Sequence, residues 1–467
     1  MTDLADPAAR AAATARLGEL YAGRPVVLGP GVLAGFAAWV GWLGELGCPT
    51  LVLATARGAG PLPGTRVVEV VPPAAATVTD ELRRHDRLAH RLPPHAVAAI
   101  EELDPDGAGV FVTTPFVTTD EPILGRAVTG GRPRAFLELE DKMRADEIWA
   151  ACGVAAAPHR IVDLDEDALA TATREVAGPL GAVWSGDARD GFNGAGNYVR
   201  WVVDRRDRVA ARAFFAPRCD RVRVLPFLEG VPCSIHGFVL PDGTAALRPV
   251  EIAVLRDVAT RSFAYAGLGT SWDPPDEDRE EMRGAVRRVG EHLRREHGYR
   301  GAFGIDGVLT ADGFRPTELN TRLSAGASAA AAVDPRFFSL LQANLVAGVD
   351  TGLTVADVES LVPVMDARRT GKVLALGEGV STTGEQSYAV AFDGTSFTRS
   401  AAGRGCTLSV AETPNGFFAR LEPCVPLAPG DRVAGVSTAL LRHLDEAHGA
   451  RFGDLEPAPD VRRSPGP

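Results

Sequence analysis

The chain has 467 residues, of which 45% are hydrophobic, and a net charge of −11. Its length predicts about three domains, and the acidic balance argues against general nucleic-acid binding, which needs a basic surface. No apolar run approaches the roughly 18 residues of a membrane span, and the first residues lack an apolar signal core, so we expect a cytoplasmic protein. Six cysteines without CxxC spacing are expected to be free thiols.

The first third of the chain alternates short apolar runs with helical stretches. The runs cover residues 25–31, 49–55 and 108–116. Short runs of this kind separated by helices are typical of a small parallel sheet. The glycines of "VLGPG", in the first run, could hold a phosphate, but an ordinary turn is the better interpretation of two glycines.

The middle of the chain predicts a helix, then two strands around a glycine-rich turn, then two further strands. These segments span residues 134–154, 181–203 and 221–243. A long helix over 273–298 opens with acidic residues and closes with basic ones, as the helix dipole favours. Asp273 is its expected N-cap.

Beyond residue 360 the sequence changes to short alternating strands with hairpin turns, followed by one helix. This pattern predicts a β-rich third domain. The tail "EPAPDVRRSPGP", residues 456–467, is rich in proline and polar residues. We therefore expect the tail to be disordered.

Residues 304–322, "GIDGVLTADGFRPTELNTR", form the most informative segment. Two strand-like runs flank "ADG", and a three-residue loop with glycine last is a common hairpin connection. A turn centred on Asp312 places residue 310 opposite 314, 306 opposite 318 and 304 opposite 320. Asp306 and Glu318 then face each other with β-carbons about 5 Å apart. Asn320 shares their face because side chains alternate along a strand.

Two opposed carboxylates need a cation between them, since like charges facing each other destabilise a sheet. Asp, Glu and Asn provide only oxygen ligands, which favours a hard cation, magnesium first. Arg322 points the same way, and its planar fork suits a phosphate or a carboxylate. Pro316 fits an edge strand, or a strand in which its nitrogen faces away from the partner.

Two other interpretations of the opposed acids are open. One is a surface hairpin whose carboxylates are merely solvated. The other is the carboxylate pair of a glycosidase, which would leave Asn320 and Arg322 without a role. The four polar groups on one face favour the metal site.

The segment "FGIDGVLTADGFRPTELNTRLSAG" resembles the C-terminal metal-binding motif of the ATP-grasp superfamily, an acid followed on the next strand by Glu-x-Asn-x-Arg. "EDKMRADEIWAACGVAAAPHRIV" is similar to the helix of that family that carries an Asp-Lys pair. "GAVWSGDARDGFNGAGNYV" is similar to its glycine-rich phosphate loop, and "RVRVLPFLEGVPCSIHG" to its hinge strand. Among the members, the layout looks most like the peptide ligases of the pheganomycin type.

This resemblance implies a multidomain α/β and α+β chain. A Rossmann-like pre-ATP-grasp domain would span residues 1–134. The ATP-grasp domain would span 135–360, with its phosphate loop near 186–197. The β-rich C-terminal domain would span 361–467 and either hold a substrate or mediate assembly.

The resemblance also implies roles for single residues. Asp306, Glu318 and Asn320 would hold magnesium, with manganese as an alternative, against the phosphates of ATP. Arg322 would act on the transferring phosphoryl group as the catalytic residue. The residues implied to bind the nucleotide are Lys142, the loop glycines Gly191, Gly194 and Gly196, the hinge residue Leu225, and Glu229 beside the ribose.

The chain departs from the family pattern at two places. Members usually carry a second lysine at the end of the strand before the glycine loop, where this chain has Trp184 and Ser185. Arg189, in the loop, is the candidate replacement. D-alanine ligases also carry an arginine two residues before the first metal acid, where this chain has Gly304, so D-alanine ligation is not expected.

These patterns predict an ATP-dependent carboxylate–amine ligase that works through an acyl phosphate and releases ADP and phosphate. Such a reaction needs positioning and charge neutralisation rather than a nucleophilic side chain, and the sequence shows no convincing Ser-His-Asp or Cys-His set. A nucleotide-binding protein without turnover and an ATP-grasp kinase are the alternatives. The expected partners are small-molecule or peptide carboxylates and amines, without nucleic acid or membrane. A homo-oligomer is left open.

Overall fold

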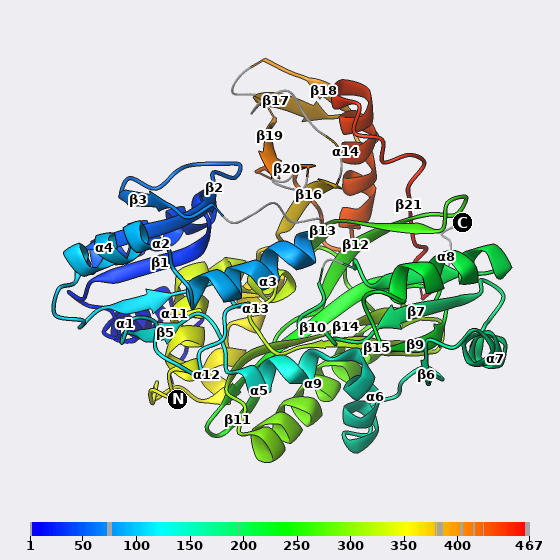
Figure 1. Ribbon diagram of the computed structural model, residues 1–467, viewed down its shortest axis with the longest axis horizontal. Helices are drawn as coiled ribbons and strands as arrows, with labels where there is room; N and C mark the ends of the chain where they lie inside the picture. The colour runs from blue at the N-terminus through cyan, green and yellow to red at the C-terminus, as the bar shows by residue number, and fades with distance from the viewer. Residues whose placement is uncertain are drawn as a thin grey trace.

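The computed structural model describes residues 2–71, 77–194, 196–378, 380, 386–401, 405–413, 416–423 and 425–462. Within these ranges the strands form sheets of five, twelve and four members. Figure 1 shows the blue N-terminal unit on one side, the teal-to-green four-stranded lobe on the other, and the gold to orange C-terminal strands with the red helix α14 above the central sheet. The chain is therefore a mixed α/β protein, as its sequence predicts.

The first unit is built on a five-stranded sheet with the order β3-β2-β1-β4-β5, in which every neighbouring pair is parallel. The small parallel sheet predicted from the apolar runs is thus present. Gly29 lies inside β1 with a φ of +105°, and a Cβ there would lie 2.6 Å from the Leu53 carbonyl oxygen. Close strand packing therefore accounts for this glycine. The elements are β1 (Val26–Val32), β2 (Thr50–Ala56), β3 (Arg66–Glu69), β4 (Val110–Val112), β5 (Ala127–Thr129), α1 (Pro7–Gly18), η1 (Leu33–Phe36), α2 (Ala37–Glu45), α3 (Val78–Ala89) and α4 (Pro94–Leu103).

A four-stranded antiparallel sheet forms the small lobe, with the order β6-β9-β7-β8. One of its faces packs on α7 and α8 around the buried Trp184. The opposite face turns toward the central sheet. The elements that lead into and form this lobe are α5 (Arg134–Leu137), η2 (Glu138–Glu140), α6 (Lys142–Ala151), β6 (Arg160–Asp163), α7 (Glu166–Val176), β7 (Ala182–Gly186), β8 (Val199–Val202), α8 (Arg205–Phe215) and β9 (Arg221–Pro226).

The central sheet begins at the edge strand β15 and runs β15-β14-β10-β12-β13. Pro316 therefore lies on an edge strand, where its missing N–H is tolerated. The first elements of the sheet are β10 (Val231–Leu240), β11 (Gly243–Ala246), β12 (Val250–Asp257), β13 (Ser262–Gly269), α9 (Asp276–His297), β14 (Gly301–Thr310) and β15 (Gly313–Asn320). The helices that follow are α10 (Ala325–Ala330), η3 (Ala331–Val333), α11 (Pro335–Val346), α12 (Val355–Glu359) and α13 (Val362–Ala367).

The strands beyond residue 360 continue this same sheet, in the order β13-β16-β20-β19-β17-β18. They share a core with the central strands, because Ala253, Leu255 and Ala266 pack with C-terminal residues. The β-rich region is thus fused to the central sheet along β13. Its elements are β16 (Gly371–Glu378), β17 (Gln386–Phe392), β18 (Phe397–Arg399), β19 (Cys406–Thr413), β20 (Gly416–Glu422), α14 (Val433–His448) and β21 (Glu456–Pro457).

The tail was predicted to be disordered, and for its described part this is wrong. β21 pairs with β12. Arg462 then reaches back to Asp278 on α9, with Nε and Nη2 each 2.8 Å from a carboxylate oxygen. Charged side chains with fixed partners therefore hold this proline-rich segment against the protein.

The start of the long helix also differs from the prediction. α9 begins at Asp276, and its N-cap is Pro275. Asp273 instead pairs with the fully buried Arg248 over 2.8 Å and with Arg369. The Asp273 carboxylate, predicted to cap the helix, therefore pairs with the buried guanidinium of Arg248 instead. Gly298 ends α9 in the left-handed conformation.

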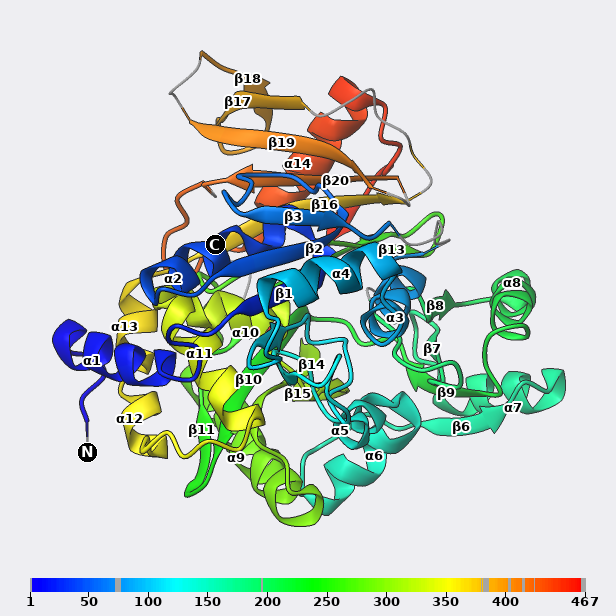
Figure 2. The ribbon, with the colours of Figure 1, turned by 60° about the vertical axis from the view of Figure 1, so that its left-hand side comes forward.

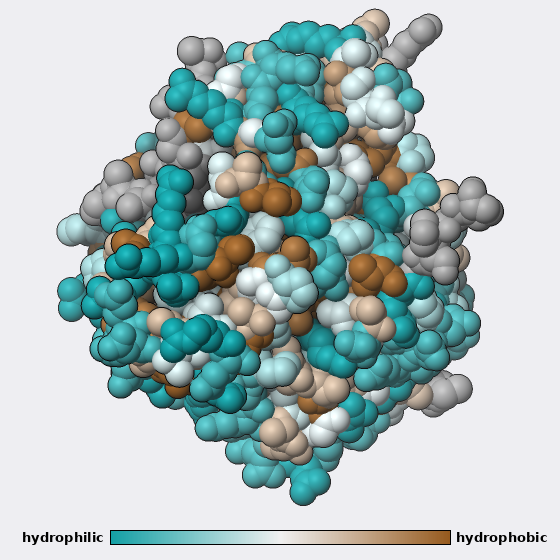
Figure 3. All heavy atoms as spheres, turned by 90° about the vertical axis from the view of Figure 1, so that its right-hand side faces the viewer, coloured by the Kyte–Doolittle hydropathy of each residue, from teal (hydrophilic) through white to brown (hydrophobic). Residues whose placement is uncertain are grey.

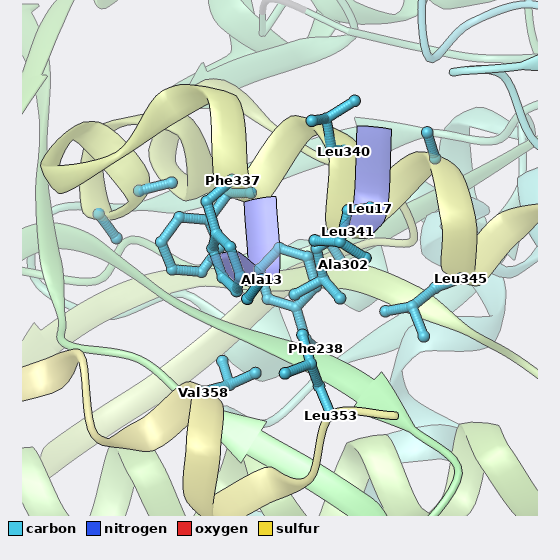
Figure 4. Packing of buried hydrophobic residues seen from close by; sticks show 14 of the residues in the cluster. Ala13, Leu17, Phe238, Ala302, Phe337, Leu340, Leu341, Leu345, Leu353 and Val358 are labelled. Atoms are coloured by element: carbon cyan, nitrogen blue, oxygen red, sulfur yellow. The ribbon is translucent and has the colours of Figure 1, made fainter. Parts of the chain in front are cut away.

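The largest core joins the first unit to the central sheet (Figure 4). Leu17 of α1 packs with Phe337 and Leu341 of α11, and these pack on Phe238 of β10. The described cysteines are also buried and free, as predicted, while Cys424 lies outside the described residues. In Figure 3 the exposed hydrophobic side chains of one face form small separate groups among hydrophilic ones. Among the described helices, none has both the length and the apolar character of a membrane span.

Candidate active site

The strongest candidate site lies on the hairpin of β14 and β15. Asp306 lies directly opposite Glu318, and Gly304 lies opposite Asn320, as the sequence predicts. The Asn320 Nδ2 donates a hydrogen bond to Asp306 Oδ2 over 3.0 Å. The three oxygen-bearing side chains therefore share one face of the sheet.

The connection between the two strands differs from the prediction. Thr310 pairs with Gly313, so the turn has two residues rather than three. Thr317 is then an extra residue on β15. A β-bulge of this kind moves the register by one residue. It restores the opposition of the two acids, which a two-residue turn alone would have lost.

The two carboxylates have different surroundings. The Nζ of Lys142, at the start of α6, lies 2.7 Å from Glu318 Oε2. For Asp306, burial and repulsion from Glu318 raise the pKa to about 7, although Arg322 and Lys142 act in the opposite direction. Burial and the neighbouring carboxylate therefore make the ionised form of Asp306 unfavourable without a further cation.

Arg322 is held by a buried carboxylate, Glu140 of η2. Glu140 forms ion pairs with both Arg132 and Arg322 and accepts a hydrogen bond from the Thr321 backbone N–H over 2.8 Å. Burial opposes the ionisation of Glu140, but the two guanidinium groups outweigh it and hold its pKa below the ordinary value. Two positive charges around one negative charge leave a net positive group that suits a phosphate or a carboxylate.

Two phenylalanine rings from different parts of the chain cover Arg322. The guanidinium carbon lies 5.2 Å from the ring centroid of Phe116 and 4.9 Å from that of Phe192. The two ring centroids are 4.8 Å apart. Phe116 follows β4 in the first unit, whereas Phe192 belongs to the glycine-rich loop after β7. Cation–π contacts therefore bring the loop and the first unit together over Arg322.

The glycine-rich loop is also bonded to helix α3 of the first unit. Arg83 Nε donates to the Phe192 carbonyl over 2.8 Å, and its Nη2 donates to Asn193 Oδ1 over 2.6 Å. Thr79 Oγ1 donates to the Gly194 carbonyl over 3.0 Å. The loop is thus held down by side chains from outside its own lobe.

The local geometry favours glycine at the three loop positions that the family resemblance selects. Gly191 and Gly196 have φ values of +98° and +71°, a conformation that favours glycine. At Gly194 a Cβ would lie 2.4 Å from the Phe192 ring. Ala195 lies outside the described residues.

Three other residues selected by the resemblance do not meet the hairpin acids. Arg189 is partly exposed and pairs with two aspartates of its own lobe, Asp190 and Asp220. Glu229 pairs with Arg256 over 2.8 Å. Leu225 is buried on β9 beside β7.

The glycine found in place of the arginine of D-alanine ligases has a structural reason. His236 of β10 lies opposite Gly304, and a Cβ at position 304 would lie 2.5 Å from His236 Cδ2. The His236 Nε2 lies 3.1 Å from Ser324 Oγ, which fixes the ring. A side chain at position 304 and His236 in this position therefore exclude each other.

Sequence reasoning missed the groups that surround Arg322. Glu140 had an available signal, since it stands two residues before Lys142 in "EDK". Arg132 and Phe116 lie in connections far from the hairpin in sequence, and no pattern marks them. Only the folded chain brings them to Arg322.

The hairpin residues fit a divalent cation. They offer oxygen donors only, which suits magnesium or manganese, and Asp306 is buried opposite a second carboxylate, which raises its pKa. Across the described ranges, no group of three or more His, Cys, Asp or Glu side chains gathers as a metal cluster. The hairpin, with its Asp, Glu and Asn, is therefore the candidate cation site.

Comparison with known proteins adds the fold. No protein-family model and no curated protein matches the chain. Among solved structures, the biotin carboxylase domain of the 2-oxoglutarate carboxylase from Hydrogenobacter thermophilus, in complex with ADP, magnesium and bicarbonate, has a TM-score of 0.56 at 14% identity, over 93% of this chain and 91% of that chain. The chain shares the fold of this domain.

Two ligases are similar over comparable lengths. The L-amino acid ligase from Bacillus licheniformis has a TM-score of 0.51 at 14% identity, over 91% of this chain and 98% of that chain. The phosphoribosylamine–glycine ligase from Thermotoga maritima has a TM-score of 0.51 at 14% identity, over 90% of this chain and 95% of that chain. At these identities the likeness shows a shared fold and not a shared reaction.

Proposed function

We propose that this protein is an ATP-dependent carboxylate–amine ligase. The observation that carries the proposal is the opposition of Asp306 and Glu318, with Asn320 and the net positive Arg322 group beside them. The shared fold supports it, since two of the similar structures are ligases and a third, a biotin carboxylase domain, is in complex with MgADP. The finer assignment, to peptide ligases of the pheganomycin type, rests on the sequence motifs alone.

The proposed reaction has two steps. A carboxylate oxygen of the first substrate attacks the γ-phosphorus of ATP, the bond to the β,γ-bridging oxygen breaks, and ADP leaves. The amine nitrogen of the second substrate then attacks the acyl carbon, the bond from that carbon to the phosphate oxygen breaks, and inorganic phosphate leaves. The nitrogen gives up a proton as the amide forms.

The residues of this chain contribute position and charge to both steps. A divalent cation held by Asp306, Glu318 and Asn320 would neutralise charge on the triphosphate. Lys142 fixes the orientation of Glu318, and Arg322 offers its guanidinium to the transferred phosphoryl group or to the acyl phosphate. Phe192 and the loop that carries it cover Arg322, which keeps water from the acyl phosphate.

The domain assignment belongs to the same proposal. The parallel sheet before residue 135 would be the Rossmann-like pre-ATP-grasp domain. The segment 135–360 would bind the nucleotide between the small lobe and the central sheet. The strands after residue 360 would complete the core rather than form a separate catalytic module.

The test is a reaction of the purified protein with ATP, magnesium, and pooled amino acids and peptides, followed by mass spectrometry. A ligase gives a dehydrated adduct of an acid and an amine, together with ADP and phosphate. A phosphorylated product would instead indicate a kinase. Tight MgATP binding without any turnover across the pools would contradict the proposal and favour a nucleotide-binding protein.

A further inference from the structure

A fully buried arginine lies between the small lobe and the metal hairpin. Arg223 of β9 is 0% exposed. Its Nε and Nη2 each lie 2.6 Å from a carboxylate oxygen of Asp146. Its Nη1 donates to the Thr317 carbonyl over 2.8 Å. All three nitrogens of the guanidinium therefore have partners inside the protein.

The Thr317 carbonyl matters because Thr317 is the extra residue of the bulge on β15. β15 is an edge strand, so a carbonyl that points away from β14 has no strand to accept from. Arg223 donates to this partly buried carbonyl, and a carbonyl shielded from water is costly without a donor. The next residue along the chain is Glu318. Arg223 thus stabilises the bulge that places Glu318 opposite Asp306.

Asp146, the other partner of Arg223, is linked to Glu318 through Lys142. Asp146 lies on α6 four residues after Lys142, which is one helical turn. Lys142 in turn pairs with Glu318. One guanidinium therefore fixes both the backbone before Glu318 and the helix that carries the cation beside it.

The position of Arg223 in the small lobe is also informative. It lies opposite Ser185 in the pairing of β7 with β9, on the face turned away from the buried Trp184. The strand end where the family usually places its second lysine thus has an arginine as its cross-strand neighbour. Because this arginine is fully bonded and buried, it acts through the hairpin rather than by touching phosphate.

We propose that Arg223 is a positioning residue that sets the affinity of the hairpin for its divalent cation by locking the bulge at Thr317 and the helix of Lys142 together. The proposal rests on the function proposed above for the same site. It deepens that function by naming the residue that couples the small lobe to the cation ligands.

The experiment measures binding of Mn²⁺ alone by electron paramagnetic resonance, so it does not depend on finding the substrates. The informative variant is the double substitution Arg223→Leu with Asp146→Leu. It removes both buried charges together, and buried ion pairs replaced by apolar residues often keep or gain stability. Arg223→Lys is the conservative variant, since lysine keeps the charge but not the bidentate fork.

The matched control is Arg283→Leu. Arg283 is a buried arginine of α9 that bonds the Glu359 carboxylate and the Leu247 backbone carbonyl, with a longer ion pair of 3.6 Å to Glu280. Glu359 keeps Arg287 as a partner in this variant. Arg283→Leu therefore also removes a buried arginine, but on the face of the sheet opposite to the two acids.

We expect the Mn²⁺ dissociation constant to rise at least tenfold in the double variant and by less in Arg223→Lys, with no change in Arg283→Leu. Thermal unfolding of each variant separates this effect from loss of the fold. A folded double variant that binds Mn²⁺ as the unsubstituted protein does would overturn the role of Arg223 while leaving the proposed ligase intact. Failure of the unsubstituted protein to bind Mn²⁺ or MgADP would overturn the proposed function, and this inference with it.

Discussion

At the scale of single residues, the site is defined by two carboxylates that the fold treats unequally. Glu318 has the ammonium group of Lys142 2.7 Å away. Asp306 is hydrogen-bonded by the Asn320 amide, and burial and the charge of Glu318 raise its pKa to about 7. The two acids are therefore equivalent as cation ligands but opposite in their effect on the stability of the cation-free protein.

Asp306→Asn and Glu318→Gln should separate these effects. In the absence of a divalent cation at pH 8, Asp306→Asn removes an unfavourable charge and should raise the free energy of unfolding by on the order of 1 kcal/mol. Glu318→Gln leaves the buried Lys142 without its carboxylate and should lower the free energy of unfolding by about 1 to 3 kcal/mol. Urea unfolding in EDTA measures both.

In the same two variants, ADP formation should fall at least a hundredfold, because each has lost a cation ligand. If Asp306→Asn stabilises the protein and abolishes its activity, then Asp306 lowers stability for the sake of function. Equal destabilisation by the two substitutions would contradict the unequal environments of the two acids.

His236 makes a prediction about pH. Burial lowers the pKa of His236 to about 3, from 6.5. Below about pH 6.5 the unfolded chain therefore takes up a proton that the folded chain does not bind, so the free energy of unfolding falls as the pH falls toward 3. At pH 5 this contribution amounts to about 2 kcal/mol. His236→Gln should remove it.

Urea unfolding of the protein and of His236→Gln between pH 5 and pH 7 checks this prediction. His85, whose pKa burial lowers to about 4, contributes with the same sign in both proteins and cancels in the difference. Parallel stability curves for the two proteins would mean that His236 is not buried in its neutral form.

At the scale of elements, the sequence predicted most of the hairpin and little of what surrounds it. Alternation along two strands was enough to place Asp306 opposite Glu318, but the route differs, because a two-residue turn and a bulge at Thr317 replace a three-residue turn. The local sequence does not distinguish a three-residue turn from a two-residue turn followed by a bulge. The bulge is decided by Arg223, a contact across 94 residues of chain.

The contacts of the glycine-rich loop show the same limit. Its glycines are visible in the sequence, whereas the helix that holds it, α3, lies more than a hundred residues earlier. Nothing in the sequence of α3 distinguishes Arg83, which bonds the loop, from Arg87, which is exposed on the same helix. Long-range partners of this kind require the fold to be known first.

Arg83→Ala should release the loop. It removes the hydrogen bonds from Arg83 to the Phe192 carbonyl and to Asn193, and a segment that loses its bonds opens more often. We expect trypsin to cleave after Arg189 several-fold faster in Arg83→Ala, with the site identified by mass spectrometry. MgATP should slow this cleavage by filling the site beneath the loop.

Arg87→Ala is the control for this experiment, because it removes an arginine from the same helix without touching the loop. Its rate of cleavage after Arg189 should equal that of the unsubstituted protein. If both variants were cleaved alike, the bonds from α3 would have no part in holding the loop.

At the scale of the whole molecule, one sheet joins the candidate site to the C-terminal strands. β13 pairs with β12 on one side and with β16 on the other, and in Figure 2 the C-terminal strands continue the stack above β13. Helix α14 is also tied to the central strands, since Glu251 of β12 accepts from the Val433 N–H over 2.6 Å and pairs with Arg432. The sequence predicted the C-terminal strands but not that they share this sheet.

Ending the chain at residue 370 should therefore damage the whole protein rather than remove an appendage. The deletion exposes the edge of β13 and the apolar residues Ala253, Leu255 and Ala266, and it leaves the fully buried Glu251 without Arg432. An unpaired edge next to an apolar face favours aggregation. We expect large aggregates in size-exclusion chromatography with light scattering, whereas Glu251→Gln in the full chain should keep the native oligomeric state with a lower melting temperature. A truncated chain with that same oligomeric state and undiminished Mn²⁺ binding would instead show that the strands after residue 370 form an independent unit.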